Sequence, residues 1–348
     1  MRRYRGGHRG RDTLGAARMD AAVGSVGIAS LDGWTPIRVH GSAAEPLVDW
    51  AVIDERFTDP FFEQSAYRAM QHPFNQVFLR TTPLDVLDAF PQTLPDGEPT
   101  GFVFHMSRCG STLIAQMLSR LSATIVLSEP QPLDGVLRLR RAGTLDDETT
   151  ARRLRGMFAA LCRPRRGERR SFVKFHAWHV VDVPLIARAF PATPWVFAFR
   201  EPRAVMRSQE KNPGAEVVPL TIDPRIAGVE ASALASISQA EYCARILAAF
   251  CDAALANAGR GRSRFVEYAD LPGAVFTDVL PSFGVSPDAD ETRRMREIAT
   301  IDAKGEGGAF QSATSLPQPS PEIERLASQW LDPLYAAMRA LRPSTGSG

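Results

Sequence analysis

The chain has 348 residues and a formal net charge of +2, and apolar residues make up 44% of it. This composition predicts a buried core and excludes a chain that is disordered throughout. So small a net charge also gives no reason to expect nucleic acid as a partner. Of the 41 basic residues only three are lysines, namely Lys174, Lys211 and Lys304. Because the chain otherwise uses Arg, each of these three lysines is a candidate for a specific role.

The cysteine spacing and the hydropathy pattern argue against a cysteine metal site, a membrane span and a secretory signal. None of the four cysteines has the spacing of a metal site, and no uninterrupted apolar run is long enough to span a membrane. The Arg-rich first twenty residues lack the apolar stretch of a secretory signal. We therefore expect a cytoplasmic protein with reduced thiols, no membrane span and no bound metal.

The elements expected along the chain divide it into three parts. Residues 1–45 show little periodicity and predict a disordered tail, and residues 46–95 predict an appendage of short helices. From there to residue 345, short apolar runs alternate with amphipathic stretches of helix length. Strands are predicted at 101–106, 123–128, 171–175, 194–199 and 264–268, and the clearest helices at 112–121, 147–162, 236–258 and 321–341. This alternation predicts a single α/β domain with a central parallel sheet flanked by helices on both faces.

One stretch is unusually rich in arginine. Eleven arginines lie between Leu137 and Arg170. They suggest an anion-binding surface, but in a chain that prefers Arg to Lys a solvated helix face is the favoured interpretation.

The strongest functional signal is the loop Ser107–Arg108–Cys109–Gly110–Ser111–Thr112, which follows a predicted strand and begins a predicted helix. Backbone N–H groups at the start of such a helix bind phosphate. Gly110 lets the backbone approach the anion closely, and Arg108 adds a fixed positive charge. A well-capped helix start is the alternative, because Ser and Thr are common caps. The context of strand, loop and helix favours anion binding.

This loop differs from the Walker A motif of ATP-binding proteins. In that motif Lys follows the last Gly, whereas Ser111 follows Gly110 here. Nor does the strand at 194–199 lead into a metal-binding Asp, since Arg200 comes next. We therefore expect a phosphate held by cations and amides without a metal, which disfavours a kinase. Arg200 and Ser208, eight residues apart across a strand-to-helix corner, are candidates to bind a second phosphate.

These two segments, SRCGSTL and FREPRAVMRS, together resemble the sulfotransferases that use 3′-phosphoadenosine 5′-phosphosulfate (PAPS). The resemblance covers about residues 101–271 and implies a P-loop-type fold and PAPS as co-substrate, with no metal. It implies that the first segment binds the 5′-phosphosulfate, and the second the 3′-phosphate. Cys109 departs from the Ser usual in the family, and Glu201 from Asp or Asn. By this similarity the donor-binding residues are Arg108, Cys109, Gly110, Ser111, Thr112, Arg200 and Ser208.

The resemblance also suggests where the chemistry takes place. Glu129, just past the second strand, matches the catalytic Glu of tyrosylprotein and several bacterial sulfotransferases. His176, two residues after Lys174, matches the catalytic His of the cytosolic enzymes. Either side chain can take a proton from an acceptor hydroxyl, and we slightly favour Glu129. A helix-capping acid and a satisfied buried histidine are the corresponding structural alternatives.

Two of the three lysines also fall at positions that the family uses. Lys174 lies at the end of the third strand, where family members keep a Lys that stabilises charge on the leaving group, a role that suits a compact ammonium. Together with Arg108, Glu129 and His176 it completes the set of catalytic candidates. Lys304, in a segment rich in Gly, Ser and Pro, weakly resembles the late loop that holds the 3′-phosphate.

The sequence therefore predicts a PAPS-dependent sulfotransferase that acts on a hydroxyl, or less readily an amine, of a small molecule or glycoconjugate. The first alternative is a non-catalytic nucleotide-binding protein of the same fold. The second is a nucleotide kinase.

Overall fold

The computed structural model describes residues 28–91, 98–300 and 318–342. Within these residues the strands form two sheets, a parallel one in the order β5-β6-β4-β7-β8 and an antiparallel one in the order β1-β2-β3. The strands are β1 (Trp34–Gly41), β2 (Pro46–Val52), β3 (Arg80–Pro83), β4 (Gly101–His105), β5 (Thr124–Ser128), β6 (Arg170–Lys174), β7 (Trp195–Phe199) and β8 (Ser263–Glu267).

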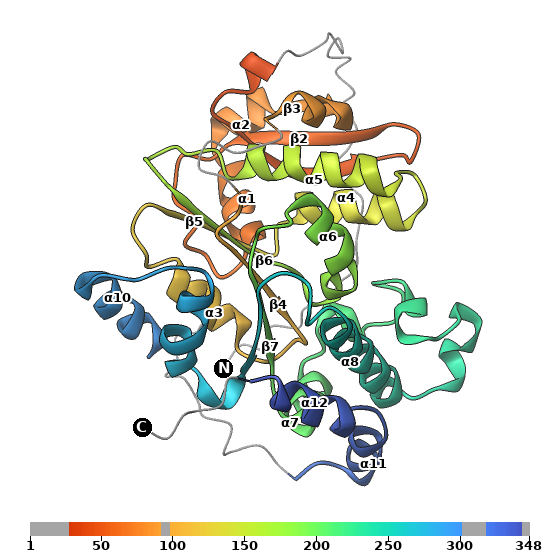
Figure 1. The fold of residues 1–348 in the computed structure, drawn as a ribbon. Helices are drawn as coiled ribbons and strands as arrows, with labels where there is room; N and C mark the ends of the chain where they lie inside the picture. Colours follow the sequence, from red (N-terminus) through yellow and green to blue (C-terminus); the bar gives the residue numbers. More distant parts are fainter. Residues whose placement is uncertain (1–27, 92–97, 301–317, 343–348) are drawn as a thin grey trace, which may run out of the picture.

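Helices cover both faces of the parallel sheet. Figure 1 shows α3 and α10 on one side of it and α6 and α8 on the other. The α-helices are α1 (Phe62–Met70), α2 (Pro73–Phe78), α3 (Ser111–Leu118), α4 (Gln131–Arg141), α5 (Asp147–Leu161), α6 (Val183–Ala189), α7 (Pro202–Lys211), α8 (Gln239–Ala256), α9 (Leu280–Ser282), α10 (Ala289–Ala299), α11 (Pro321–Trp330) and α12 (Asp332–Ala340). Short 3₁₀ turns include η2 (Leu84–Ala89), η3 (Ala177–Asp182) and η5 (Pro224–Ala227). Every helix in the described ranges is too short or too polar to cross a lipid bilayer.

The predicted fold class is confirmed, because the central strands are parallel and buried on both faces. All residues of β4, β5 and β7 are buried, as expected for strands that helices cover on both sides. β4 lies in the middle, and the chain leaves it first toward β5 and later crosses back to β7. In open parallel sheets, ligands bind at the carboxyl ends of the strands where such a reversal occurs.

The last predicted helix is two helices. The periodicity at 321–341 predicted one helix, whereas α11 ends at Trp330 and α12 begins at Asp332. Pro333 lies in the first turn of α12. Proline has no N–H to donate to the preceding turn and its ring crowds that turn, so the helix breaks there.

The N-terminal part of the chain differs from its prediction. Residues 28–45, placed in a disordered tail, include β1, which pairs antiparallel with β2. The helical appendage at 46–95 contains α1 and α2 but also β2 and β3. Two features hid these strands: β1 has a register shift after Pro36, and β2 buries the carboxylate of Asp49. That carboxylate accepts hydrogen bonds from Arg38 and from Thr81 on β3, so the polar residue is part of the sheet. Residues 1–27 lie outside the described ranges.

The N-terminal layer, which consists of this sheet and η2, packs on α4 and α5 (Figure 1), and a glycine lies at each of two contacts. A Cβ at Gly135 of α4 would lie 2.4 Å from Val39 Cβ, and a Cβ at Gly156 of α5 would lie 2.1 Å from the carbonyl oxygen of Leu87. Real Cβ atoms do not approach so closely, so each glycine allows the contact between its helix and the N-terminal layer.

Gly156→Ala should therefore destabilise the protein by about 1–3 kcal/mol, the usual cost of overpacking a core. Alanine favours a helix interior by about 1 kcal/mol over glycine, so a loss of stability would report the clash with the Leu87 backbone. Urea denaturation measures the change. The matched control is Gly259→Ala, since a Cβ at Gly259 has no neighbour within 4 Å. Equal stabilities for the two variants would show that the N-terminal layer does not pack on α5 in this way.

Candidate active site

A cavity of about 960 Å³ opens at the carboxyl ends of the parallel strands. Residues that follow β4, β5, β6 and β7 line it, as the topology requires. Ten predicted site residues lie on its wall: Arg108, Cys109, Gly110, Ser111, Thr112, Glu129, Lys174, His176, Arg200 and Ser208. Lys304, the remaining candidate, lies outside the described residues. The fold thus brings together candidates that are up to 100 positions apart in the sequence.

The loop after β4 presents the open end of a helix to this cavity. Ser107, Arg108 and Gly110 all have a positive φ, and successive N–H groups in turns that include such residues form concave anion-binding surfaces. Gly110 precedes α3, and no side chain caps the helix. The first N–H groups of a helix have no acceptor within it. They are therefore available to an anion in the cavity.

The side chain of Cys109 anchors this loop to the sheet. Its thiol donates to the carbonyl oxygen of Ala198 on β7 at 3.1 Å, and burial raises the pKa of the thiol to about 11. The side chain stays protonated near neutral pH and holds the loop on the sheet. Only the backbone of Cys109 is then left to contact a ligand.

Two arginines from different strand ends approach the same region. Arg108 donates to the carbonyl oxygen of Asn212, while its Nε is buried without a hydrogen-bond partner. Burial also lowers the pKa of Arg108. Arg200 lies with its guanidinium 4.2 Å from the centre of the Tyr268 ring and donates to the carbonyl oxygen of Arg108 at 3.3 Å. A buried guanidinium nitrogen without a partner, beside an uncapped helix start, is a chemical fit for an oxyanion.

Lys174, Glu129 and His176 form a cluster in the same cavity as the loop after β4. The Lys174 side chain is only 2% exposed and forms an ion pair with Glu129. The second carboxylate oxygen of Glu129 lies 3.3 Å from Nδ1 of His176. The backbone N–H of Glu129 donates to the carbonyl oxygen of Lys174 at 2.7 Å, and Glu129 itself has a left-handed φ of 56°. The ends of β5 and β6 therefore place the predicted acid, ammonium and imidazole within direct contact.

The charge on Glu129 follows from these neighbours. Burial by itself raises the pKa of this carboxyl, but the Lys174 ammonium and hydrogen bonds from His105 and His176 hold the pKa well below its usual range. Glu129 is therefore ionised at neutral pH, as a proton acceptor must be.

His105 has a structural role. Its Nδ1 accepts the N–H of Ser107 at 3.1 Å, so the proton lies on Nε2, which faces the carbonyl oxygen of Phe175 at 3.0 Å. Burial lowers the pKa of His105 and favours this neutral form. The ring ties the loop after β4 to the end of β6.

Sequence reasoning did not identify another part of the cavity wall. It includes a face of α4, with Gln131, Asp134, Arg138 and Arg141, together with Trp178, Asp223 and Arg225. Spacings of three and four residues along α4 place its four members on one face, and that periodicity could have revealed them. Trp178 stacks on His176 with ring centres 4.3 Å apart and donates to Asp134 at 3.0 Å. This wall therefore also fixes the His176 ring.

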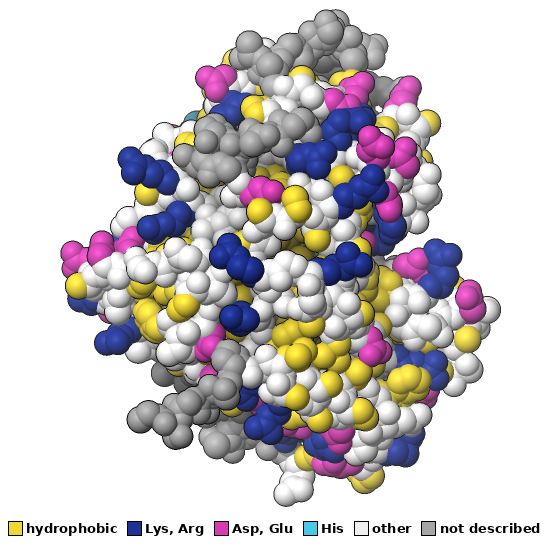
Figure 2. Space-filling model, in the orientation of Figure 1, with side chains coloured by type: hydrophobic (Ala, Val, Ile, Leu, Met, Phe, Trp, Pro, Cys, Tyr) yellow, Lys and Arg dark blue, Asp and Glu magenta, His cyan; other side chains and the backbone are white. Residues whose placement is uncertain are grey.

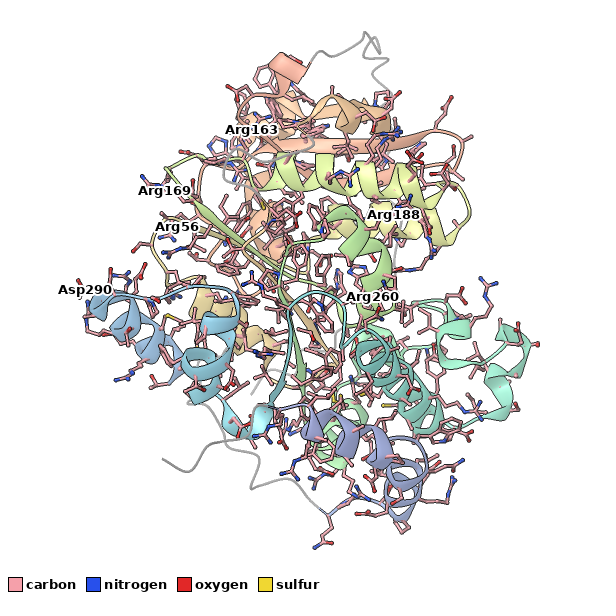
Figure 3. All side chains as sticks on the ribbon, viewed as in Figure 1. Arg56, Arg163, Arg169, Arg188, Arg260 and Asp290 are labelled. Carbon is pink, nitrogen blue, oxygen red and sulfur yellow. The ribbon has the colours of Figure 1, made fainter. Side chains whose placement is uncertain are left out.

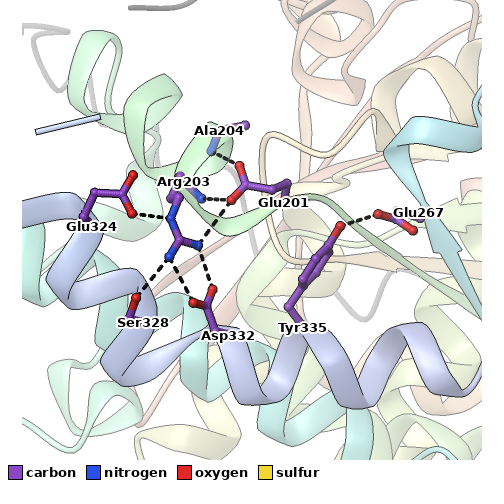
Figure 4. Close-up of polar contacts among 8 residues, drawn as sticks. All are labelled: Glu201, Arg203, Ala204, Glu267, Glu324, Ser328, Asp332 and Tyr335. Atoms are coloured by element: carbon purple, nitrogen blue, oxygen red, sulfur yellow. Dashed lines mark hydrogen bonds and ion pairs between the residues drawn. The ribbon is translucent and has the colours of Figure 1, made fainter. Parts of the chain in front are cut away.

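Arg203, inside the second motif, ties helices together instead of lining the cavity (Figure 4). It pairs with Asp332 and Glu324, which raises its pKa, and so joins α7 to α11 and α12. Glu201, the departure from the family pattern, caps α7 by accepting the N–H groups of Arg203 and Ala204. The motif thus combines cavity residues with residues that hold the C-terminal helices.

No protein-family model matches the chain, and no curated protein matches its sequence. Solved structures with similarity include a sulfotransferase domain from the curacin biosynthetic pathway, 15% identical with a TM-score of 0.42, which covers 67% of this chain and 97% of that one. A sulfotransferase domain of the Synechococcus PCC 7002 olefin synthase is 18% identical with a TM-score of 0.42, over 68% and 95% of the two chains. A sulfotransferase from Alicyclobacillus acidocaldarius is 15% identical with a TM-score of 0.42, over 71% and 97%.

Proposed function

We propose that this protein is a sulfotransferase that transfers a sulfuryl group from PAPS to a hydroxyl of a small molecule or glycoconjugate. The observation that carries the proposal is the meeting of two phosphate-binding motifs with Lys174, Glu129 and His176 in one cavity. These residues come from four strand ends, and no single local motif required them to meet.

The donor would lie along the wall formed by the two motifs. Its 5′-phosphosulfate end fits the open helix start of α3 and the guanidinium of Arg108, whose Nε is buried without a partner. Its 3′-phosphate fits Arg200 and Ser208, which also line the cavity. Backbone N–H groups and planar guanidinium forks suit phosphate oxygens because they offer several donors in fixed directions.

The bound donor supplies an activated sulfuryl group: the acceptor oxygen bonds to sulfur, the bond from sulfur to the bridging oxygen breaks, and adenosine 3′,5′-bisphosphate leaves with that oxygen. Lys174 is placed to stabilise the charge that develops on the bridging oxygen. Glu129 takes the proton of the acceptor hydroxyl, and His176 holds that carboxylate in position through Nδ1. The acceptor would approach from the side of α4 and Trp178.

Nucleotide binding provides the first test. Adenosine 3′,5′-bisphosphate at a concentration 100 times its Kd should stabilise the protein by about 2.7 kcal/mol, measured as a rise in Tm. Adenosine 5′-monophosphate, which lacks the 3′-phosphate, should stabilise it less, and Arg200→Ala should remove that difference between the two nucleotides.

The outcomes separate the candidate functions. No thermal shift with millimolar adenosine 3′,5′-bisphosphate would contradict the proposal. Stabilisation without transfer of labelled sulfate from PAPS to any component of a metabolite extract would indicate the non-catalytic alternative. Magnesium-dependent turnover of ATP would indicate a kinase.

A further inference from the structure

A second pocket, of about 380 Å³, lies at the opposite edge of the parallel sheet. It forms where α3 ends and the chain turns into β5, between α10 and the loop after β2. Its lining contains three arginines, three hydroxyl side chains and no carboxylate: Arg56, Thr58, Ser119, Arg120, Leu121, Ser122, Ala123 and Arg294. It shares no lining residue with the large cavity. We propose that this arginine pocket binds a small molecule bearing a phosphate or sulfate group.

The arginines converge because they bind the backbone of one turn. Arg56 donates to the carbonyl oxygen of Leu121 at 3.1 Å. Arg294 donates to the carbonyl oxygen of Arg120 at 3.2 Å and to the hydroxyl of Ser122 at 3.1 Å. These acceptors are neutral, so they orient the guanidinium groups without cancelling their charge.

Arg120 provides an independent sign that the pocket suits an anion. Its Nε is buried and has no hydrogen-bond partner. Among the described residues, none of Arg56, Arg120 and Arg294 forms an ion pair with a carboxylate, although much of the remaining arginine content does. An unsatisfied buried donor costs about 1–3 kcal/mol, and more when it is charged. An oxyanion in the pocket would satisfy Nε and balance three positive charges.

The carboxylate of Glu291, which binds the same turn, already accepts hydrogen bonds from the backbone. The buried carboxylate of Glu291 accepts the backbone N–H of Ser122 at 2.7 Å and that of Asp288 at 3.0 Å. Its ion pair with the guanidinium of Arg170 is long, at 3.9 Å. Glu291 therefore holds the turn and the start of α10. It forms no ion pair with the three pocket arginines.

Arg169 extends the positive charge along the same edge. Its backbone N–H donates to the carbonyl oxygen of Ala123 at 2.8 Å, which fixes it beside the turn. Figure 3 shows Arg169 and Arg56 along one side of the molecule. In Figure 2 this side shows Lys and Arg side chains, and the acidic side chains gather lower, over α10. The arginine-rich stretch of the sequence thus contributes to a localised positive surface.

The class of ligand follows from these donors. Guanidinium groups bind the oxygens of phosphate and sulfate in pairs. A volume near 380 Å³ lies within the range of pockets for small molecules. The pocket therefore suits a phosphate or sulfate ester with a small organic part.

Calorimetric titration at constant ionic strength tests the site, with inorganic phosphate and inorganic sulfate as separate probes. The variant R108A/R200A, altered only in the large cavity, should retain binding of at least one probe. The large cavity is itself proposed to bind phosphate, so R120A/R294A is added to R108A/R200A. The combined variant should bind that probe about 10- to 100-fold more weakly than R108A/R200A, the loss expected for charge-assisted hydrogen bonds. A stronger signal with phosphate or with sulfate identifies the group that the site prefers.

Arg188→Ala provides the matched control, because Arg188 lies on α6 away from this edge (Figure 3). Added to R108A/R200A, it should leave binding of the probe unchanged. If R120A/R294A loses its native circular dichroism, R120K/R294K replaces it, and its expected loss is about tenfold because the ammonium lacks the planar fork. Unchanged binding by the folded variant would overturn the proposal, as would loss of all binding in R108A/R200A or an equal loss in Arg188→Ala.

Discussion

Lys174→Ala should lower the rate of sulfuryl transfer roughly 10²–10³-fold, the scale for losing one donor that stabilises the transition state. The ammonium is buried beside Glu129 and lines the cavity next to the phosphate loop. Lys174→Arg should lose nearly as much, although it keeps the charge. The Lys174 side chain is only 2% exposed and lies 5.1 Å from the centre of the Phe61 ring, so the space has no room for a planar fork.

Control variants separate the loss of transfer rate from a loss of stability. Lys174→Ala leaves the buried Glu129 carboxylate without its main partner, and breaking such a pair costs about 3–5 kcal/mol of stability. The double variant K174A/E129Q removes both charges and should recover part of that stability without recovering the rate. Lys211→Ala, at an exposed lysine, should change the rate less than twofold. Full activity of Lys174→Arg would show that only the charge matters, and full activity of Lys174→Ala would refute the assignment.

Glu129→Gln should lower kcat about 10²–10⁴-fold, because the amide cannot take the acceptor proton. His176→Asn should cost about tenfold, because in the proposed mechanism His176 only orients the carboxylate. Steady-state kinetics with PAPS and a single acceptor measure both effects. A nearly unchanged rate for Glu129→Gln, with an inactive His176→Asn, would reverse the two roles.

The pH profile gives an independent measure of the same assignment. A base must be deprotonated to act, so activity falls as the pH drops through its pKa. The pKa of Glu129 lies well below 4.5, so kcat/KM should stay level between pH 5 and 8 if Glu129 is the base. A base with the pKa of an ordinary imidazole would instead make kcat/KM fall below about pH 6.5.

The sequence predicted much of the parallel sheet because its signals are local. The apolar runs at β4, β7 and β8 and the periodicity of α5 and α8 depend only on nearby residues. The same holds for the phosphate loop, where Gly110 and its hydroxyl neighbours lie within one turn of a helix start. The strand β1 was missed because its partner, β2, contains a buried Asp49 whose role depends on Arg38 and Thr81.

By itself, the sequence predicted the fold class, the candidate phosphate-binding loop and the candidates Glu129, Lys174 and His176. Their relation to one another was decided only by the tertiary structure. The sequence treated Glu129 and His176 as rivals, whereas the carboxylate contacts both the ammonium of Lys174 and the imidazole. The arginine pocket likewise joins Arg56, Arg120 and Arg294 from three separate segments. Charge balance depends on distances between side chains, and strand order and helix packing fix those distances for residues far apart in the chain.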